Sequence, residues 1–191
     1  MTKIVLISGS VRRDSLNASV LATVRRLLAE RPDGDTYEIE SLSVGLLPHF
    51  DWDVEQADGS PEVRAAKRLV GDADAVFIST PAYNGEMPGV LKNALDWLSR
   101  PNAESALSGR TVALTSASPG ARGAVDAQTA LARVLAKCGA RVVDHEPVAV
   151  GRAGQLLTPD GDFTDAETVA ALGGLIDATL AAVREPAGAS A

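Results

Sequence analysis

Short apolar runs alternate along the chain with longer stretches in which apolar residues recur every three or four positions. The runs are rich in β-branched residues and predict strands at 4–7, 37–41, 75–78, 111–115 and 142–143. The longer stretches predict helices at 16–28, 63–70, 90–98, 127–136 and 169–183. Strand and helix therefore alternate along most of the chain.

This alternation is typical of a three-layer α/β domain with a parallel sheet. The first, third and fourth runs are apolar nearly throughout, as strands buried on both faces are. We expect a five-stranded parallel sheet in the common order 2-1-3-4-5, within one domain at 1–184. Residues 185–191 are mostly Pro, Gly, Ala and Ser, and we expect them to form a disordered tail.

The composition is that of a soluble globular protein. Of the 191 residues, 46% are hydrophobic and 23% charged, and the longest apolar runs are far shorter than the roughly 20 residues of a membrane span. The chain begins without a signal-peptide pattern, and its one cysteine, Cys138, fits a reducing cytoplasm. The net charge of -7 argues against a nucleic-acid or anionic-membrane surface, so an anionic ligand would need local donors.

Three polar loops follow the first, third and fourth predicted strands. In an open parallel sheet, ligands bind beyond the carboxyl ends of the strands, where the strand order reverses. The loops at 9–17, 81–89 and 116–124 all belong to that edge of the predicted sheet. Their coincidence there is the main physical argument for a functional site.

The first loop, GSVRRDSLN, has the residues of a phosphate cradle. Ser10, Ser15 and Asn17 offer side-chain donors, and the helix that begins near Ser15 offers free backbone N–H groups with a partial positive charge. Arg12 can add a charge-assisted pair of hydrogen bonds. The alternative is a surface turn in which Asp14 or Ser15 is only a helix N-cap.

The two common nucleotide signatures are absent from this loop. It has one glycine and no lysine, which excludes a Walker loop. Gly9 is also not followed by the glycine spacing of a dinucleotide-binding fold. A nucleoside triphosphate and a Rossmann-bound NAD are therefore disfavoured, and a monophosphate remains.

The second loop, PAYNGEMPG, indicates what the phosphate carries. Tyr83 can lie against a flat ring and Asn84 can hydrogen-bond an amide-like edge. A planar heterocycle with an amide edge and a monophosphate describes FMN. The alternative is a turn that caps the helix at 90–98, with Tyr83 in the core. In the third loop, close backbone approach to the same ligand or a simple Pro-Gly turn explains Ser116, Ser118, Gly120 and Gly123.

Hydrolytic and metal chemistry have little support in the sequence. His49 and His145 are the only histidines, and neither has a recognisable serine partner. One cysteine and two distant histidines do not make a metal site. No catalytic side chain and no metal ligand are therefore predicted. Phe50 and Trp52 could wall a substrate pocket or simply pin their loop to the domain.

The three loops together resemble the NADPH-dependent FMN reductase family, which includes bacterial quinone and chromate reductases and some azoreductases. GSVRRDSLN is similar to the family motif G-S-x-R-x-x-S-x-N, and PAYNGEMPGVLKNALDW to P-E-Y-N-x-x-x-P-G-x-L-K-N-A-x-D-W. SASPGARGA is similar to S-x-S-P-G-x-x-G-G. The resemblance covers residues 3–180 and implies a flavodoxin-like fold.

The resemblance also implies site residues. It places the FMN phosphate on Ser10, Arg12, Ser15, Leu16 and Asn17. It places the isoalloxazine ring on Pro81, Ala82, Tyr83, Asn84 and Gly85, and the third flavin loop on Ser116, Ser118, Gly120 and Gly123. Two positions depart from the family pattern. Ala82 stands where the family has glutamate, which removes a carboxylate near the flavin edge, and Ala124 replaces the second glycine of the last pair.

The function implied is an FMN-dependent NAD(P)H oxidoreductase. NADPH or NADH reduces bound FMN, and a small acceptor such as a quinone, free flavin, chromate or azo compound reoxidises it. The family also implies a homodimer or homotetramer, with the helix at 90–98 at the contact. A flavodoxin-type electron carrier and a non-catalytic FMN- or phospholigand-binding protein are the alternatives. Arg12 argues against the carrier, because flavodoxins hold the phosphate with uncharged donors.

Overall fold

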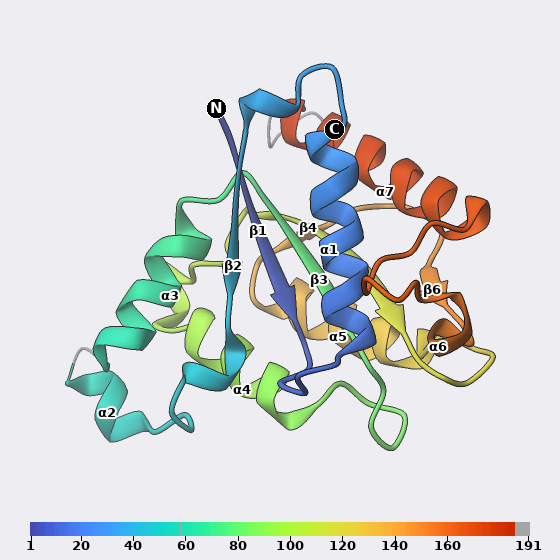
Figure 1. The fold of residues 1–191 in the computed structure, drawn as a ribbon. Coiled ribbons are helices and arrows are strands. Elements are labelled where there is room, and N and C mark those ends of the chain that lie inside the picture. The colour runs from blue at the N-terminus through green and yellow to red at the C-terminus, as the bar shows by residue number, and fades with distance from the viewer. Residues whose placement is uncertain (58, 186–191) are drawn as a thin grey trace.

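Parallel strands in the predicted order form the central sheet (Figure 1). The computed structural model describes residues 1–57 and 59–185. Its strands are β1 (Thr2–Ser8), β2 (Tyr37–Leu42), β3 (Ala75–Thr80), β4 (Thr111–Ala117), β5 (Arg141–Val142) and β6 (Val148–Val150). The order β2-β1-β3-β4-β5, with β6 also paired to β4, confirms the predicted topology.

Helices connect the strands and cover both faces of the sheet. They are α1 (Leu16–Ala29), α2 (Trp52–Gln56), α3 (Pro61–Gly71), α4 (Gly89–Leu98), α5 (Val125–Lys137), α6 (Ala153–Leu156) and α7 (Ala166–Arg184). Short 3-10 turns occur at Gly34–Thr36, Val44–Leu46 and Asn102–Glu104. The predicted helices and strands begin and end within about three residues of the observed ones, which is the usual uncertainty of boundaries predicted from sequence.

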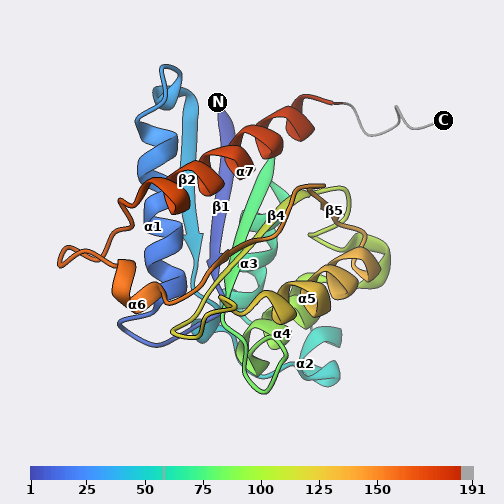
Figure 2. The same ribbon diagram turned by 90° about the vertical axis from the view of Figure 1, so that its right-hand side faces the viewer.

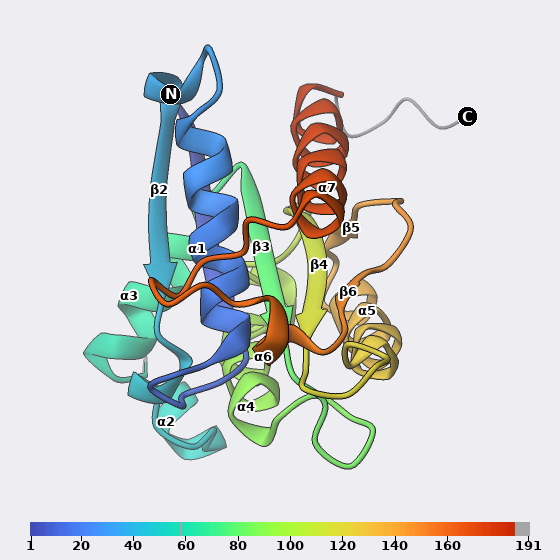
Figure 3. The same ribbon diagram turned by 45° about the vertical axis from the view of Figure 1, so that its right-hand side comes forward.

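The sheet separates two hydrophobic cores, which makes the domain three-layered (Figures 2 and 3). On one face, α1 and α7 pack against strand residues such as Leu6 and Phe77. On the other face, α3, α4 and α5 pack against Val76 and Ile78. Neighbouring residues of β3 point into different cores because side chains alternate across a strand. Both faces are therefore covered, as the apolar strands predict.

Three of the long helices, α1, α3 and α7, begin at a residue whose side chain accepts a hydrogen bond from a backbone N–H group of the first turn. Ser15 caps α1 and accepts a hydrogen bond from Ala18 N, and Ser60 caps α3, which has Pro61 in its first turn. Asp165 caps α7 through a hydrogen bond from Thr168 N of 2.9 Å. These caps place the helix beginnings where the sequence pattern changes.

The last helix, α7, is long and apolar enough to cross a membrane by length and composition. In this fold, apolar side chains of α7 pack in the hydrophobic core. Leu172, Leu175, Ile176 and Leu180 are buried in the core between α7, α1 and the sheet. The composition of α7 is therefore explained by its packing in the domain.

The fifth strand differs from the prediction, because it is split. β5 pairs with Thr111 and Val112 at the start of β4, and β6 pairs with the segment from Thr115 to Ala117 at its end. Residues 143–147 lie between them outside the ladder, and Pro147 directly precedes β6. The single domain at 1–184 stays a prediction, and the predicted tail lies outside the described residues from 186 onward.

Candidate functional site

The three polar loops meet at the carboxyl ends of the strands. The ladder pairs Ser8 with Ser79 and Thr80 with Ser116, so β1, β3 and β4 end beside one another. The loops that follow enclose a small cavity of about 170 Å³. It is lined by Ser10, Arg12, Ser15, Leu16, Asn17, Pro81, Ala82, Tyr83, Ala117, Ser118 and Pro119. Residues from all three loops therefore contribute to one site.

The first loop leaves β1 in close contact with β3. Gly9 N–H donates to the carbonyl of Ser79 at 2.8 Å, which extends the ladder by one residue. A Cβ atom at Gly9 would lie 2.9 Å from Thr80 Oγ1 and 3.0 Å from Leu91 Cδ2. A residue with a Cβ atom would be too close to Thr80 and Leu91, so glycine suits the position at which the chain leaves the sheet.

The beginning of α1 offers an anion-binding set of donors. Ser15 Oγ accepts from Ala18 N at 3.3 Å, so Ser15 is the N-cap of α1. Its hydroxyl hydrogen remains free to donate to a ligand. Among the described residues, the backbone N–H groups of Leu16 and Asn17 have no acceptor, as expected in the first turn of a helix.

Arg12 and Ser10 lie beside these donors. Arg12 is exposed, and its guanidinium donates to the carbonyl of Asp14, which holds the side chain over its own loop. Ser10 Oγ accepts from Arg12 N at 3.3 Å. One guanidinium, two hydroxyls and two free backbone N–H groups suit a phosphate dianion. The donor set therefore fits the phosphate of FMN.

Asn17 has a second connection that the motif does not reveal. Its side chain is buried and makes three hydrogen bonds with the ends of two strands. Asn17 Oδ1 accepts from Ala117 N at 2.9 Å and from Ser79 Oγ at 2.8 Å, and Asn17 Nδ2 donates to Ala117 O at 3.0 Å. The side chain ties α1 to β3 and β4, and the backbone N–H is what remains for a ligand.

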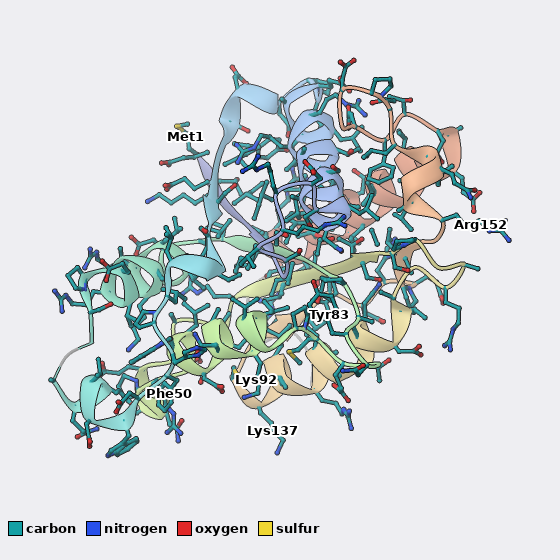
Figure 4. The ribbon with its side chains drawn as sticks, turned by 60° about the horizontal axis from the view of Figure 1, so that its bottom comes forward. Met1, Phe50, Tyr83, Lys92, Lys137 and Arg152 are labelled. Atoms are coloured by element: carbon teal, nitrogen blue, oxygen red, sulfur yellow. The ribbon has the colours of Figure 1, made fainter. Side chains whose placement is uncertain are left out.

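The second loop is a two-residue β-hairpin. Tyr83 and Glu86 exchange backbone hydrogen bonds of 2.8 and 3.1 Å, and Asn84 and Gly85 at the tip have φ of 54° and 83°. Two positive φ angles define a type I′ turn, for which Asn-Gly is the preferred pair. Tyr83 is 54% exposed at this edge of the molecule, not in the core (Figure 4). Of this loop, Pro81, Ala82 and Tyr83 line the cavity, and Asn84 and Gly85 form the turn beyond it.

The third loop contributes Ser118 to the cavity, together with Ala117 and Pro119. Ala117 and Pro119 lie inside the SASPGARGA motif but are not among the residues predicted from it. Ser116 has a different environment. It is fully buried, and its Oγ accepts from Gln128 Nε2 of α5 at 2.7 Å, because alternate side chains of β4 point to opposite faces.

The two glycines of the third loop also lie outside the cavity lining. Gly123 has φ of 59°, and a Cβ atom there would lie 2.6 Å from the carbonyl carbon of Ala149. Its small size therefore serves the packing of the loop on β6. Ala124, which departs from the family glycine, also adopts a left-handed conformation with φ of 64°. This left-handed conformation explains why the family has glycine at this position.

Residues 148–156 hold the third loop in place, and sequence patterns did not reveal them. Ser118 N donates to Val150 O at 3.1 Å, and Ala153 N donates to Ser118 O at 3.1 Å. Arg152 N also donates to Gly120 O at 3.0 Å. Because β6 and α6 have three and four residues, no periodicity could identify them.

Phe50 and Trp52 pin their loop to the end of α4. The Arg100 guanidinium lies 5.8 Å from the Phe50 ring and 5.7 Å from the Trp52 ring, and Phe50 meets Trp97 edge-on at 4.9 Å. Neither aromatic lines the cavity, and Phe50 and Tyr83 lie on different parts of this edge (Figure 4). Of the two interpretations of these aromatics, the structure supports the pinned loop.

The sheet order and the cradle at the point where it reverses define a flavodoxin-like, mononucleotide-binding α/β domain. A solved flavodoxin from Pseudomonas aeruginosa shares this fold, with a TM-score of 0.57, 17% identity and coverage of 96% of this chain and 100% of its own. The chain belongs to the NADPH-dependent FMN reductase family, whose sequence model matches residues 2–155.

Curated and solved relatives agree with this assignment. A 2-hydroxy-1,4-benzoquinone reductase from a Burkholderia species is 34% identical over 184 residues, covering 96% of this chain and 97% of that protein. A quinone reductase from Escherichia coli K12 is 32% identical over 179 residues, covering 92% of each chain. The FerB flavoenzyme from Paracoccus denitrificans, an NAD(P)H:(acceptor) oxidoreductase, matches with a TM-score of 0.84 and 33% identity over 96% of this chain and 97% of its own. The predicted family, fold and class of enzyme are confirmed: the chain is an FMN-dependent NAD(P)H oxidoreductase.

Proposed function

We propose that this chain reduces small quinones with electrons from NADPH or NADH, and that its FMN binds in the cavity between the three loops. The observation that carries the proposal is the set of free donors at the start of α1, next to an exposed tyrosine from the neighbouring loop. The relatives named quinone reductase support the class of acceptor. Bound FMN supplies the hydride and electron chemistry, so the side chains have to bind and orient it.

The phosphate end of the cavity has five donors in this proposal. The Arg12 guanidinium and the hydroxyls of Ser10 and Ser15 contact phosphate oxygens, together with the backbone N–H groups of Leu16 and Asn17. In a protein of net charge -7, these local donors must offset the repulsion of an anion. The Asn17 side chain has an indirect role in binding the phosphate. It fixes the start of α1 to the strand ends and so holds the backbone N–H groups there in position.

The ring end of the cavity is formed by Pro81, Ala82, Tyr83 and Ser118. Tyr83 presents an exposed aromatic face, and the Asn84–Gly85 turn holds it there. Because Ala82 stands where the family has glutamate, no carboxylate from this position faces the ring edge. Ser116, Gly120 and Gly123 lie outside the cavity lining, and their role is to fix the conformation of the third loop. An uncharged edge suits neutral acceptors such as quinones.

We also propose that the protein is a cytoplasmic homodimer or homotetramer. Val11 of the first loop is 64% exposed, Tyr83 of the second loop is 54% exposed, and Leu46 in the segment after β2 is 71% exposed. Gly45 lies against Val11, so the segment that carries Leu46 runs beside the first loop, and we take Val11 and Leu46 as one apolar patch. The outer side of α4 carries the Lys92–Asp96 ion pair of 2.6 Å, so this apolar patch is the better subunit contact.

Replacing Arg12 tests the phosphate end. Arg12→Ala removes a charge-assisted contact of about 1.5–3 kcal/mol, so the FMN dissociation constant should rise roughly ten- to hundredfold. Arg13→Ala is the matched control, because Arg13 does not line the cavity. Riboflavin affinity should change little in either variant, since riboflavin has no phosphate. Equal FMN affinity of Arg12→Ala and the parent would remove Arg12 from the cradle.

Anaerobic reduction tests the activity. Adding NADPH or NADH to the FMN-loaded protein should bleach the flavin absorbance, and a benzoquinone should restore it within the mixing time of a stopped-flow experiment. Bleaching by dithionite but by neither nicotinamide would favour the electron-carrier alternative. Protein that takes up no FMN would favour neither and would contradict the cavity assignment.

A further inference from the structure

A second cavity lies where the fifth strand is interrupted. It has a volume of about 380 Å³ and is lined by residues of β4, β5, α5 and α7 and of the connection at 143–147. Figure 3 shows this connection curving away from β4 between β5 and β6. The cavity shares no lining residue with the flavin cavity. It is therefore a separate space at the outer edge of the sheet.

The walls of this cavity are mainly apolar. Leu114 of β4, Val142 of β5 and Leu175 of α7 face it from three elements. Ala132 of α5 also lines it, and its small side chain leaves room for a ligand. Apolar walls with a few placed polar groups are typical of sites for small molecules. The polar groups of this cavity therefore indicate which molecule it suits.

The first polar group is a backbone N–H without a partner. Val112 O accepts from Val143 N at 2.9 Å, so the backbone groups of Val112 face the fifth strand. Those of Leu114, two residues further along β4, face the same side. The ladder stops after Val143 and resumes only at the pairing of Thr115 with Val148. Within residues 1–57 and 59–185, Leu114 N–H has no acceptor, although Leu114 is only 9% exposed.

The second polar group is the carboxamide oxygen of Gln128, on a side chain that is only 7% exposed. Gln128 Nε2 donates to Ser116 Oγ at 2.7 Å and to Val148 O at 2.9 Å, which fixes the orientation of the carboxamide. Gln128 Oε1 accepts no hydrogen bond from the part of the chain that the structure describes, and Gln128 lines the cavity. Val148 pairs with Thr115, directly after Leu114. The free acceptor and the free donor therefore belong to the same short stretch of sheet edge.

A phenolic hydroxyl satisfies both groups at once. Its hydrogen donates to Gln128 Oε1, and its oxygen accepts from Leu114 N–H. A carboxylate at this place has no hydrogen for Gln128, and an ammonium group has no lone pair for Leu114. Buried polar groups without partners are costly, so a ligand that supplies both hydrogen bonds gains affinity.

A cation lies on the same helix as Gln128. Arg133 is exposed, lines the cavity and makes no ion pair with the residues that the structure describes. It lies five residues after Gln128, which is roughly 7.5 Å along the axis of α5. Glu146 is the one carboxylate among the lining residues, and it is exposed as well. Arg133 can therefore receive an anionic group at the end of the ligand opposite the hydroxyl.

We propose that this cavity binds a small aromatic acid with a phenolic hydroxyl. The hydroxyl lies between Leu114 N–H and Gln128 Oε1, the ring lies against the apolar walls, and the carboxylate meets Arg133. The proposal goes beyond the proposed function, because this site is separate from the flavin cavity and takes no part in electron transfer.

An NMR titration of isotope-labelled, FMN-loaded protein with 4-hydroxybenzoate tests the site without turnover. The Leu114 amide signal should shift to saturation, and its hydrogen exchange should slow because it gains an acceptor. Benzoate lacks the hydroxyl and should bind roughly tenfold more weakly. Phenol lacks the carboxylate and should bind a few-fold more weakly, since exposed ion pairs contribute little.

Two results of this titration would overturn the proposal. Equal affinities for 4-hydroxybenzoate and benzoate would mean that the hydroxyl meets neither Leu114 N–H nor Gln128 Oε1. Shifts that gather at Tyr83 and Ser118 and leave Leu114 unchanged would place the acid in the flavin cavity instead.

Substitutions on α5 test the same site from the protein side. Ala132→Phe fills the cavity and should abolish binding of 4-hydroxybenzoate, and Ala136→Phe, at an exposed position of α5 outside the lining, is its matched control. Arg133→Gln should weaken 4-hydroxybenzoate a few-fold and leave phenol unchanged. Lys137→Gln makes the same change in charge one turn further along α5, outside the cavity, and should bind like the parent.

The variants also separate this proposal from its alternatives. Parent-like binding in a folded Ala132→Phe, or equal losses in Arg133→Gln and Lys137→Gln, would refute the site. No saturable binding in the parent, together with a sedimentation coefficient that falls in Ala132→Phe, would assign the cavity to a second copy of the chain. Quinone reduction by Ala132→Phe and Arg133→Gln should equal that of the parent. A protein that binds the acid at Leu114 and reduces no quinone loses the proposed function alone.

Discussion

Asn17 shows how one side chain organises a site that it contacts only through its backbone. Its carboxamide joins the start of α1 to Ser79 at the end of β3 and to both backbone groups of Ala117 at the end of β4. The three segments belong to the three loops of the cavity. Fixing them to one another lowers the cost of ordering the loops when a ligand binds.

Asn17→Ala should therefore reduce stability and flavin affinity together. The change leaves Ser79 Oγ and both Ala117 backbone groups without partners at a buried position, which costs about 2–4 kcal/mol by the penalty for unsatisfied groups. Urea unfolding gives the loss of stability, and FMN and riboflavin titrations give the affinities. Both flavins should bind more weakly, unlike the Arg12→Ala result. Asn84→Gly, an exposed asparagine at positive φ, is the control and should change stability little.

Arg152 has an unfavourable backbone conformation, and a substitution there tests its cost to stability. It is exposed, with φ of 50°, a region that side chains rarely adopt without cost. Arg152→Gly should stabilise the protein by about 0.5–1 kcal/mol, after allowing for the greater freedom of glycine in the unfolded chain. Ala22→Gly in the middle of α1, also exposed, should do the reverse by about 1 kcal/mol. Thermal unfolding of both variants gives the two signs, and a destabilised Arg152→Gly would refute the strain argument.

At the residue scale, the motifs predict which loops form the site. They predict less well which side chains of those loops face the cavity. Ser116 lies in its motif but points to α5, because the alternation along β4 depends on where the strand begins. Ala117 and Pro119 line the cavity although neither has a functional side chain. The Asn84–Gly85 pair was readable as a hairpin turn, because Asn-Gly is the preferred pair of a type I′ turn.

At the element scale, the predictable parts are those with enough residues to show a period. The apolar strands β1, β3 and β4 and helices such as α1 extend over several turns or pleats, and their burial fixes their positions. β6 and α6 have no such pattern, and contacts with the third loop determine them. The split of the fifth strand depends on tertiary packing as well, and only Pro147 marks it in the sequence.

The loop before α7 is attached to α1 by Asp162. This carboxylate accepts hydrogen bonds from Thr23 Oγ1 and Arg26 Nε, and Arg26 also donates to Phe163 O at 3.0 Å. Partial burial acts to raise the pKa of Asp162, but the hydrogen bonds from Thr23 and Arg26 outweigh it and lower the pKa below its ordinary value. Phe163 beside it is fully buried, so the attachment also fills the core.

This pKa shift predicts a pH dependence of stability. Because the folded-state pKa of Asp162 is lowered, its contribution is present above the ordinary carboxyl value of about 4 and disappears as the pH falls through the folded-state value. Asp162→Asn should be about 1–2 kcal/mol less stable at pH 7, and its stability should fall less steeply than that of the parent below pH 4. Urea midpoints from pH 7 to pH 3 measure both.

Asp177→Asn is the control for this experiment. Asp177 pairs with Arg31 at 2.8 Å on the surface, with a side chain 66% exposed, and such pairs contribute little. If Asp162→Asn and Asp177→Asn have the same stability at pH 7, the attachment of the loop does not depend on the Asp162 carboxylate.

At the scale of the whole molecule, the apolar patch of Val11 and Leu46 predicts self-association. Leu46→Asp places a charge in this patch. Sedimentation velocity should show a shift from dimer toward monomer, with a dimer dissociation constant raised on the order of a hundredfold. Leu156→Asp, at an exposed leucine outside the patch, should sediment like the parent. A parent protein that sediments as a monomer would contradict the proposed assembly.

The split fifth strand has a consequence for the folded protein in concentrated solution. The outer strands of an open sheet carry unpaired backbone groups, onto which a strand of another molecule can add. On one side of this sheet, β2 is an edge strand with the exposed charges of Glu38 and Glu40. On the other side, the break at 143–147 and Pro147 leave only the short β5 and β6. Neither side offers a long, uncharged template, so the fold resists ordered aggregation through its sheet.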